Sequence, residues 1–222
     1  MTTVEIRVRG SHTATFPPEQ ATVRAAVSFD GPDAEPVLAA AAAALSLISS
    51  SIEERHHPKR GPITRYAIDQ VRTGAHRPWN ADGKQLPLVH TVVASVTATF
   101  IDFDELTRWV AESGSIDGLT IDHVEWDLSE VKLRKVERIA RQKAVRDAAR
   151  RAQDYADALG LGSVAVSAVN DPGLADTVAR KVVMANAMSA PGGGPPELTM
   201  RPEDVQIHAE VEATFVIPPR GK

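Results

Sequence analysis

The chain has 222 residues, 43% of them hydrophobic and 24% charged, which is the composition of a soluble globular protein with one sizeable core or two small ones. Its formal net charge of −4 argues against a general nucleic-acid or anionic-membrane binder, because both kinds of binding depend on a basic surface. The absence of cysteine excludes disulfides, thiolate nucleophiles and cysteine-ligated metal sites.

The first part of the chain predicts two strands and a helix. Apolar and polar residues alternate over residues 4–9 and again over residues 21–29, as in strands with one buried face. Residues 1–10 contain no basic region followed by an apolar one, so we expect no secretion signal and a cytoplasmic protein. Asp33 is placed to cap a helix that ends before Pro58. Serines interrupt the alanine-rich run at residues 37–52, which predicts a helix too weakly apolar to span a membrane.

The middle of the chain predicts a strand-helix-strand pattern that occurs twice. Residues 63–72 and 88–100 are predicted strands on either side of a turn-rich loop, residues 73–87. Asp102 and Glu105 form a capping-box-like start for a short helix that ends at Gly114, and residues 119–128 form the next strand. The two passes cover residues 21–72 and 88–128. An internal duplication fits this pattern, and so do two unrelated βαβ units that share start and stop signals.

A long helix is predicted for residues 129–159. Alanine recurs at every fourth position and forms a narrow stripe on one face, at Ala140, Ala144, Ala148, Ala152 and Ala156. Such a stripe lets a helix lie close against a sheet or a second helix. The segment contains nine Lys and Arg against five Asp and Glu, a formal charge of +4 that leaves −8 for the remainder of the chain.

The last part of the chain predicts two strands, at residues 164–169 and 205–215. Residues 171–203 lie between them, contain a run of proline and glycine, and predict a flexible loop or flap. The predicted order is ββαββαβαββ, an α+β fold in which a long helix and two shorter helices pack on a mixed, largely antiparallel sheet. We expect a single domain over residues 1–217, with room for two lobes.

Several of these segments together resemble the SIMPL-domain family. They are the opening strand that ends in Gly10, the loop at residues 79–83 that leads into residues 90–99, the helix at residues 140–162 and the strand at residues 202–215. The family includes bacterial periplasmic and outer-membrane-associated immunogenic proteins. The resemblance implies an α+β fold, self-association and a link to stress tolerance, and it brings neither a catalytic residue nor a cofactor.

Two surfaces are candidates for contacts with a partner. The loop carries Trp79 beside Arg77, a combination typical of protein–protein hot spots. The polar face of the long helix carries arginines that suit an acidic protein partner, or the acidic remainder of a second copy. These arginines are Arg134, Arg138, Arg141 and Arg150. The alternative is a solvated helix face with ion pairs such as the one between Glu137 and Arg141.

The sequence assigns no catalytic, cofactor-binding or metal-ligating residue. It contains no HExxH motif, no GxSxG motif and no phosphate-binding glycine loop. We therefore expect a non-enzymatic interaction or scaffold protein that forms a homo-oligomer. The alternative is a hydrolase or metal-dependent enzyme with a site around His90, His123 and Asp102. A nucleic-acid binder that uses the arginines of residues 134–151 is a third interpretation.

Overall fold

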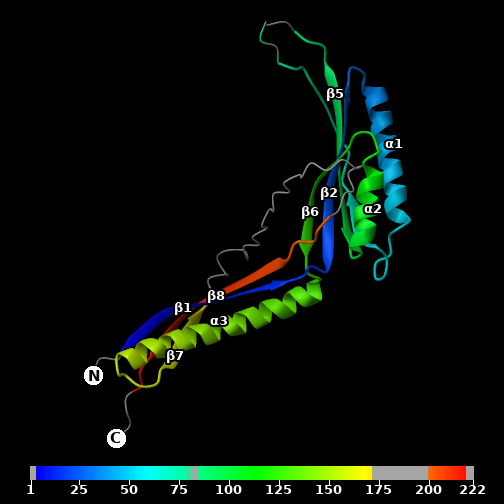
Figure 1. The fold of residues 1–222 in the computed structure, drawn as a ribbon. Coiled ribbons are helices and arrows are strands. Elements are labelled where there is room, and N and C mark those ends of the chain that lie inside the picture. Colours follow the sequence, from blue (N-terminus) through cyan, green and yellow to red (C-terminus); the bar gives the residue numbers. More distant parts are fainter. Residues whose placement is uncertain (1–3, 80, 82–84, 172–199, 219–222) are drawn as a thin grey trace, which may run out of the picture. The chain divides into compact units, whose positions relative to one another are not determined.

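The computed structural model describes residues 4–79, 81, 85–171 and 200–218 (Figure 1). Most of the predicted flap at residues 171–203 lies outside the described residues. The elements follow in the order β1 (Glu5–Phe16), β2 (Gln20–Gly31), α1 (Ala34–Glu53), β3 (Ile63–Ile68), β4 (Arg72–His76), β5 (Val89–Phe100), α2 (Phe103–Ser113), β6 (Leu119–Asp127), α3 (Glu130–Ala158), β7 (Ala165–Asn170) and β8 (Val205–Val216). The predicted α+β fold is confirmed.

Two features of the predicted sheet are corrected by the structure. The strands form two sheets, and every pair of named strands is antiparallel, where one mixed sheet was expected. β4 lies in the predicted loop, because Arg72 to His76 pair with Val93 to Val89 of β5. Only this pairing makes the segment a strand, since its own residues show no strong alternation.

Contacts divide the chain into two compact units. Unit 1 contains Met1–Pro17, Leu128–Ser189 and Asp204–Lys222, and unit 2 contains Pro18–Asp127 and Ala190–Glu203. Each unit has its own sheet, its own helices and its own hydrophobic core.

Unit 1 is a three-stranded sheet with the order β1-β8-β7 and α3 across one face (Figure 1). The buried face alternates along β1 and β8, with Ile6 opposite Phe215 and Gly10 opposite Val211. The alanine stripe of α3 packs on this face, as predicted, and its five alanines are at most 2% exposed. The small side chains allow a close approach, because a Cβ atom added at Gly10 would lie 2.7 Å from the Cβ of Ala148 and against the backbone of Ala144.

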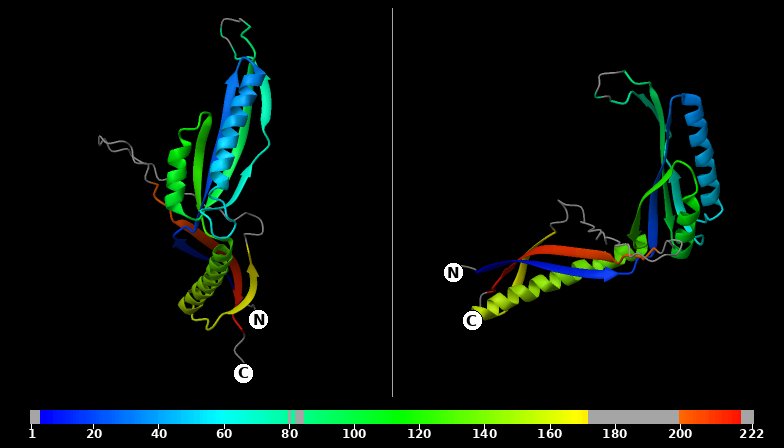
Figure 2. Two further views of the ribbon diagram at one scale, coloured as in Figure 1. Left: turned by 90° about the vertical axis from the view of Figure 1, so that its right-hand side faces the viewer. Right: turned by 45° about the horizontal axis from the view of Figure 1, so that its top comes forward.

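Unit 2 is a sheet with the order β3-β5-β2-β6, to which β4 adds beside β5. Because neighbouring strands are antiparallel, β2 and β3 run parallel to each other, and so do β5 and β6. The segments β2-α1-β3 and β5-α2-β6 are therefore two interlocked βαβ units, the arrangement known as ferredoxin-like. Both helices lie on the same face of the sheet (Figure 2). The strand-helix-strand pattern predicted twice from the sequence is thus confirmed, and both βαβ segments have the same topology.

The core of unit 2 lies between this sheet and its two helices. The ring of Trp109 is fully buried 5.5 Å from that of Phe100, and its Nε1 donates a hydrogen bond to Ser51 Oγ at 3.1 Å. Asp102 is the N-cap residue of α2, as predicted, and its side chain accepts hydrogen bonds from the backbone N–H groups of Asp104 and Glu105. Asp33 is the N-cap residue of α1, as predicted, but its side chain makes no capping hydrogen bond.

Helix α1 is long and apolar enough to cross a membrane, with a mean hydropathy of 1.5, so the prediction of a too weakly apolar run is corrected. A core helix of a soluble protein has the same length and composition. In unit 2 one stripe of α1 is buried against β2 and β5, and 28% of the apolar window is buried. The stripe consists of Val37, Ala41, Ala44, Ile48 and Ile52.

Candidate interaction surfaces

The exposed face of α3 carries a group of cations that we call the basic face, formed by Lys135, Arg138, Lys143 and Arg146. Helical geometry places Arg138 opposite the buried alanine stripe. Lys143 and Arg146 lie toward the edge of β1, where they line a surface hollow with Ser11 and His12. All four are exposed, and none forms an ion pair with another residue in the described part of the chain. Their charge is therefore available to an anionic partner.

The remaining predicted arginines of α3 are engaged within the helix. Arg134 pairs with Glu130, and Arg141 lies 4.0 Å from Glu137. Arg150 donates to Asp147 at 2.6 Å. These three arginines therefore form ion pairs within α3, and Arg138 is the one predicted arginine on the basic face.

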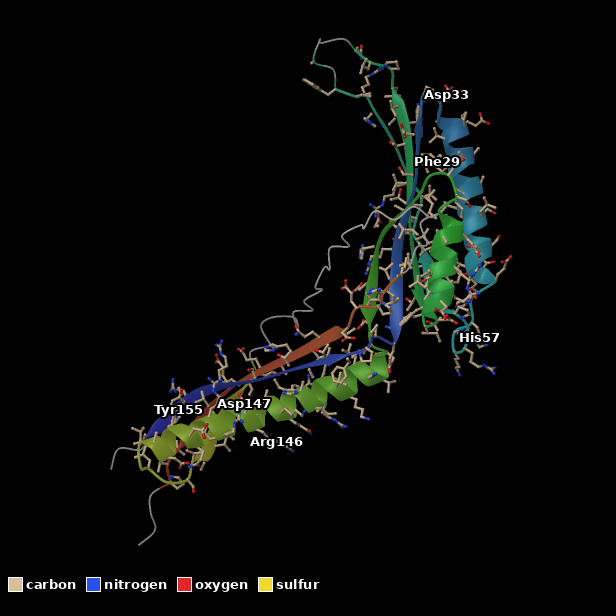
Figure 3. All side chains as sticks on the ribbon, viewed as in Figure 1. Phe29, Asp33, His57, Arg146, Asp147 and Tyr155 are labelled. Carbon is tan, nitrogen blue, oxygen red and sulfur yellow. The ribbon has the colours of Figure 1, made fainter. Side chains whose placement is uncertain are left out.

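Asp147 joins α3 to the edge of β1. It lies on the side of the helix that faces the strands (Figure 3), where Ser11 N donates to its Oδ2 at 3.2 Å. The pKa of Asp147 is lowered by this backbone N–H group first and by Arg150 second, because both stabilise the carboxylate form. Arg151 Nη1 donates to the carbonyl of Arg9 at 2.7 Å. Two side chains of α3 therefore satisfy backbone groups on the outer edge of β1, a contact that the sequence analysis missed.

Charged side chains also pair on the open face of the unit 1 sheet. Arg9 contacts Glu212 at 2.6 Å and Glu210 at 3.1 Å. The hydrogen bond that Arg9 donates to Glu212, together with the two carboxylate charges, raises the pKa of Arg9. Thr13 Oγ1 lies 2.9 Å from His208 Nδ1. The two glutamates and Arg9 therefore form an ion-pair group on this face.

The loop between β4 and β5 presents Trp79, whose side chain is 86% exposed. Arg77 Nη1 donates to the carbonyl of Leu86 at 2.7 Å, just beyond the pairing of His76 with Val89. Arg77, predicted as a partner contact, thus holds the two arms of the loop together. Trp79 is the exposed aromatic residue of this loop.

The structure separates the residues of the alternative catalytic site. His90 lies at the start of β5 opposite Gly31, whereas Asp102 follows the other end of that strand and caps α2. Ten residues of extended strand span about 33 Å. His123 lies opposite Arg24, near the middle of the sheet. Among the described residues, no three His, Asp or Glu side chains are grouped so that they could hold a metal ion.

Charge is distributed unequally between the two units. Unit 1 holds 15 Lys and Arg against 11 Asp and Glu, and unit 2 holds 10 against 18. The formal charges are therefore +4 and −8, which together give the −4 of the whole chain. The positive charge of unit 1 is concentrated in α3.

Comparison with known proteins gives a family. The model of the SIMPL family, described as a protein of unknown function (DUF541), matches residues 6–215. No curated protein matches the chain. Because the match covers nearly all of the 222 residues and both units, this chain belongs to the SIMPL family of proteins of unknown function.

Proposed function

We propose that this SIMPL protein is a non-enzymatic interaction protein that self-associates, with the basic face of α3 in one copy contacting acidic surface of unit 2 in another. The proposal is carried by the unequal charge of the units, +4 and −8, together with the four cations of the basic face. Ion pairs within unit 1 do not use these cations.

Opposite charge on two parts of one chain favours contact between copies. A positive patch on one copy and a negative surface on the next attract each other over roughly one Debye length, about 10 Å at 0.1 M salt. The attraction speeds encounter and selects the orientation of the copies. Contact between two different surfaces closes into a two-fold dimer when both copies make it reciprocally, and into a ring or a filament when it runs head to tail.

Trp79 supplies an apolar contact that charge alone does not provide. An indole exposed to 86% is costly to leave in water and contributes strongly when a partner covers it. We place it in the contact as an anchor, with Arg77 fixing the loop from within.

The test is the mass of the protein in solution, measured by light scattering coupled to size-exclusion chromatography. At about 50 mM salt we expect an oligomer at micromolar concentration, whose mass falls at about 0.5 M salt because the charges of the α3 contact are then screened. The double variant Arg138→Glu/Arg146→Glu should have, at low salt, the lower mass that the unchanged protein has at high salt. Arg7→Glu is the matched control, since Arg7 is 79% exposed on β1 and belongs to the open face of the sheet.

A monomer at every salt concentration would refute the proposal. So would an oligomer that the double charge reversal leaves intact.

A further inference from the structure

Sheet edges in the described part of the chain differ in how well they are protected against pairing with another strand. An exposed edge presents unpaired backbone N–H and C=O groups, and proteins usually protect such edges with charges, short strands or covering groups. On β1 the edge is capped by Asp147 and Arg151 of α3. On β6 it carries Asp122, Glu125 and Asp127.

The other side of the unit 2 sheet is also protected. The start of β3 is bonded to the end of the α1 segment, since Ile63 N donates to Arg55 O and His57 N donates to Ile63 O. β4 has five residues and begins with Arg72.

β7 has neither kind of protection in the described part of the chain. It runs from Ala165 to Asn170, contains no charged residue, pairs with β8 alone, and is exposed at all six positions. Val166 and Val169 are 60% and 50% exposed. An uncharged edge with β-branched side chains is the kind that adds a further strand.

A bulge in β7 places both valines on one face. The register shifts between Val166 and Ala168, so that Val166 lies opposite Phe215 and Val169 opposite Ala213. In a regular strand, residues three apart point to opposite faces. Here both valines lie on the apolar face of the sheet. Helix α3 covers this face over β1 and β8, and the two valines extend it beyond the helix.

We infer that β7 pairs antiparallel with β7 of a second copy across a two-fold axis, which joins two unit 1 sheets into one six-stranded sheet. The inference rests on the proposed self-association and adds a second, separate contact to it. A second copy of β7 fits this edge. A two-fold axis perpendicular to the sheet requires that the two residues opposed across it point to the same face, and the bulge places Val166 and Val169 on the same face. Val166 then lies opposite Val169 of the partner subunit, and Ala165 lies opposite Asn170 of the partner subunit. Uncharged strands of the same sequence pair without repulsion.

The first test places a charge on this edge. Val166→Lys/Val169→Lys should halve the mass measured by light scattering, because two lysines per copy would be brought together at the seam. Val131→Lys is the matched control, since Val131 is 82% exposed at the start of α3 and should leave the mass unchanged. Far-UV circular dichroism and the thermal midpoint verify that the variants are folded. A folded double variant with the mass of the unchanged protein would overturn the inference.

The second test uses the absence of native cysteine. Directly opposed residues of antiparallel strands have Cα atoms about 4.5 to 5.5 Å apart, within the range of a disulfide. Ala165→Cys/Asn170→Cys should therefore give a covalent dimer under mild oxidation. Each single cysteine variant should not, because the same position in the two copies would be about 17 Å apart. Dimers from the single variants, or no dimer from the double variant, would overturn the proposed register.

The two proposals fail in different ways. If the lysine variant keeps its mass and the charge reversals on α3 abolish association, the β7 contact is refuted and the proposed function survives. If the unchanged protein is monomeric at every salt concentration, both are refuted.

Discussion

At the scale of single residues, Gly10 shows how closely α3 lies on β1. A Cβ atom at this position would press against Ala144 O and Ala148 N, both of them backbone atoms that cannot rotate away. The alanine stripe alone predicts a close approach, but it does not show which strand residue lies beneath it. Gly10 is recognisable from the sequence only as the end of a strand, because the helix that packs on it is distant in sequence.

We expect Gly10→Ala to lower the free energy of unfolding of unit 1 by about 2 to 3 kcal/mol, since the added methyl group has no space and helix and strand must separate. Chemical denaturation followed by far-UV circular dichroism measures this change. Gly74→Ala is the control, because a Cβ atom there would meet only Thr91 Oγ1, at 3.7 Å. A change below about 0.5 kcal/mol is expected for the control. Equal effects of the two substitutions would contradict the packing described for Gly10.

At the scale of elements, α3 both covers a sheet face and closes the edge of β1. Asp147 and Arg151 bond to backbone groups of β1 at 3.2 Å and 2.7 Å. A carboxyl group whose pKa is lower in the folded than in the unfolded protein stabilises the fold above the unfolded value, about 3.9. That stabilisation is lost as the pH falls through the folded-state pKa. The lowered pKa of Asp147 therefore contributes to stability at neutral pH and not in strong acid.

Asp147→Asn should lower the free energy of unfolding of unit 1 at pH 7 by up to about 1 kcal/mol, the range of a partly exposed ion pair. The difference from the unchanged protein should shrink as the pH falls below about 4. Denaturant titrations between pH 7 and pH 2.5 measure both effects. Asp154→Asn makes the same change in charge on the exposed side of α3 and serves as the control. A deficit in Asp147→Asn that stays constant down to pH 2.5 would contradict the role given to the carboxylate.

The elements also differ in how far their own residues define them. β8 and β2 were predictable, because the alternation of apolar and polar residues along a half-buried strand does not depend on which strands it pairs with. β4 was not, because Arg72 to His76 are exposed on both faces and become a strand only through pairing with β5. The unpaired state of Arg138 and the internal bond of Arg77 depend on neighbouring side chains in the same way.

At the scale of the whole molecule, the chain crosses between two units that each have a separate core. All three tryptophans, Trp79, Trp109 and Trp126, belong to unit 2. Tryptophan fluorescence therefore reports on unit 2 alone, whereas far-UV circular dichroism also reports on unit 1 through α3, the longest described helix.

In Gly10→Ala we expect the two signals to separate. Thermal unfolding by circular dichroism should show an early transition from unit 1, while the midpoint by fluorescence should remain within about 1 °C of the unchanged protein. Non-coincident transitions are the mark of units that unfold separately. If both midpoints fall together, the two units unfold as one cooperative body, and separate stability is excluded.

The sequence by itself determined the elements with strong periodicity, the alanine stripe of α3 and the membership of the SIMPL family, because these depend on residues close together in the chain or on a pattern along its whole length. Tertiary structure alone decided the division into two sheets, the closing of β1 by Asp147 and Arg151, the bulge that aligns Val166 with Val169, and the separation of His90, His123 and Asp102. The physical reason is that hydrogen bonds and ion pairs between distant segments depend on register, and a shift of one residue changes every partner.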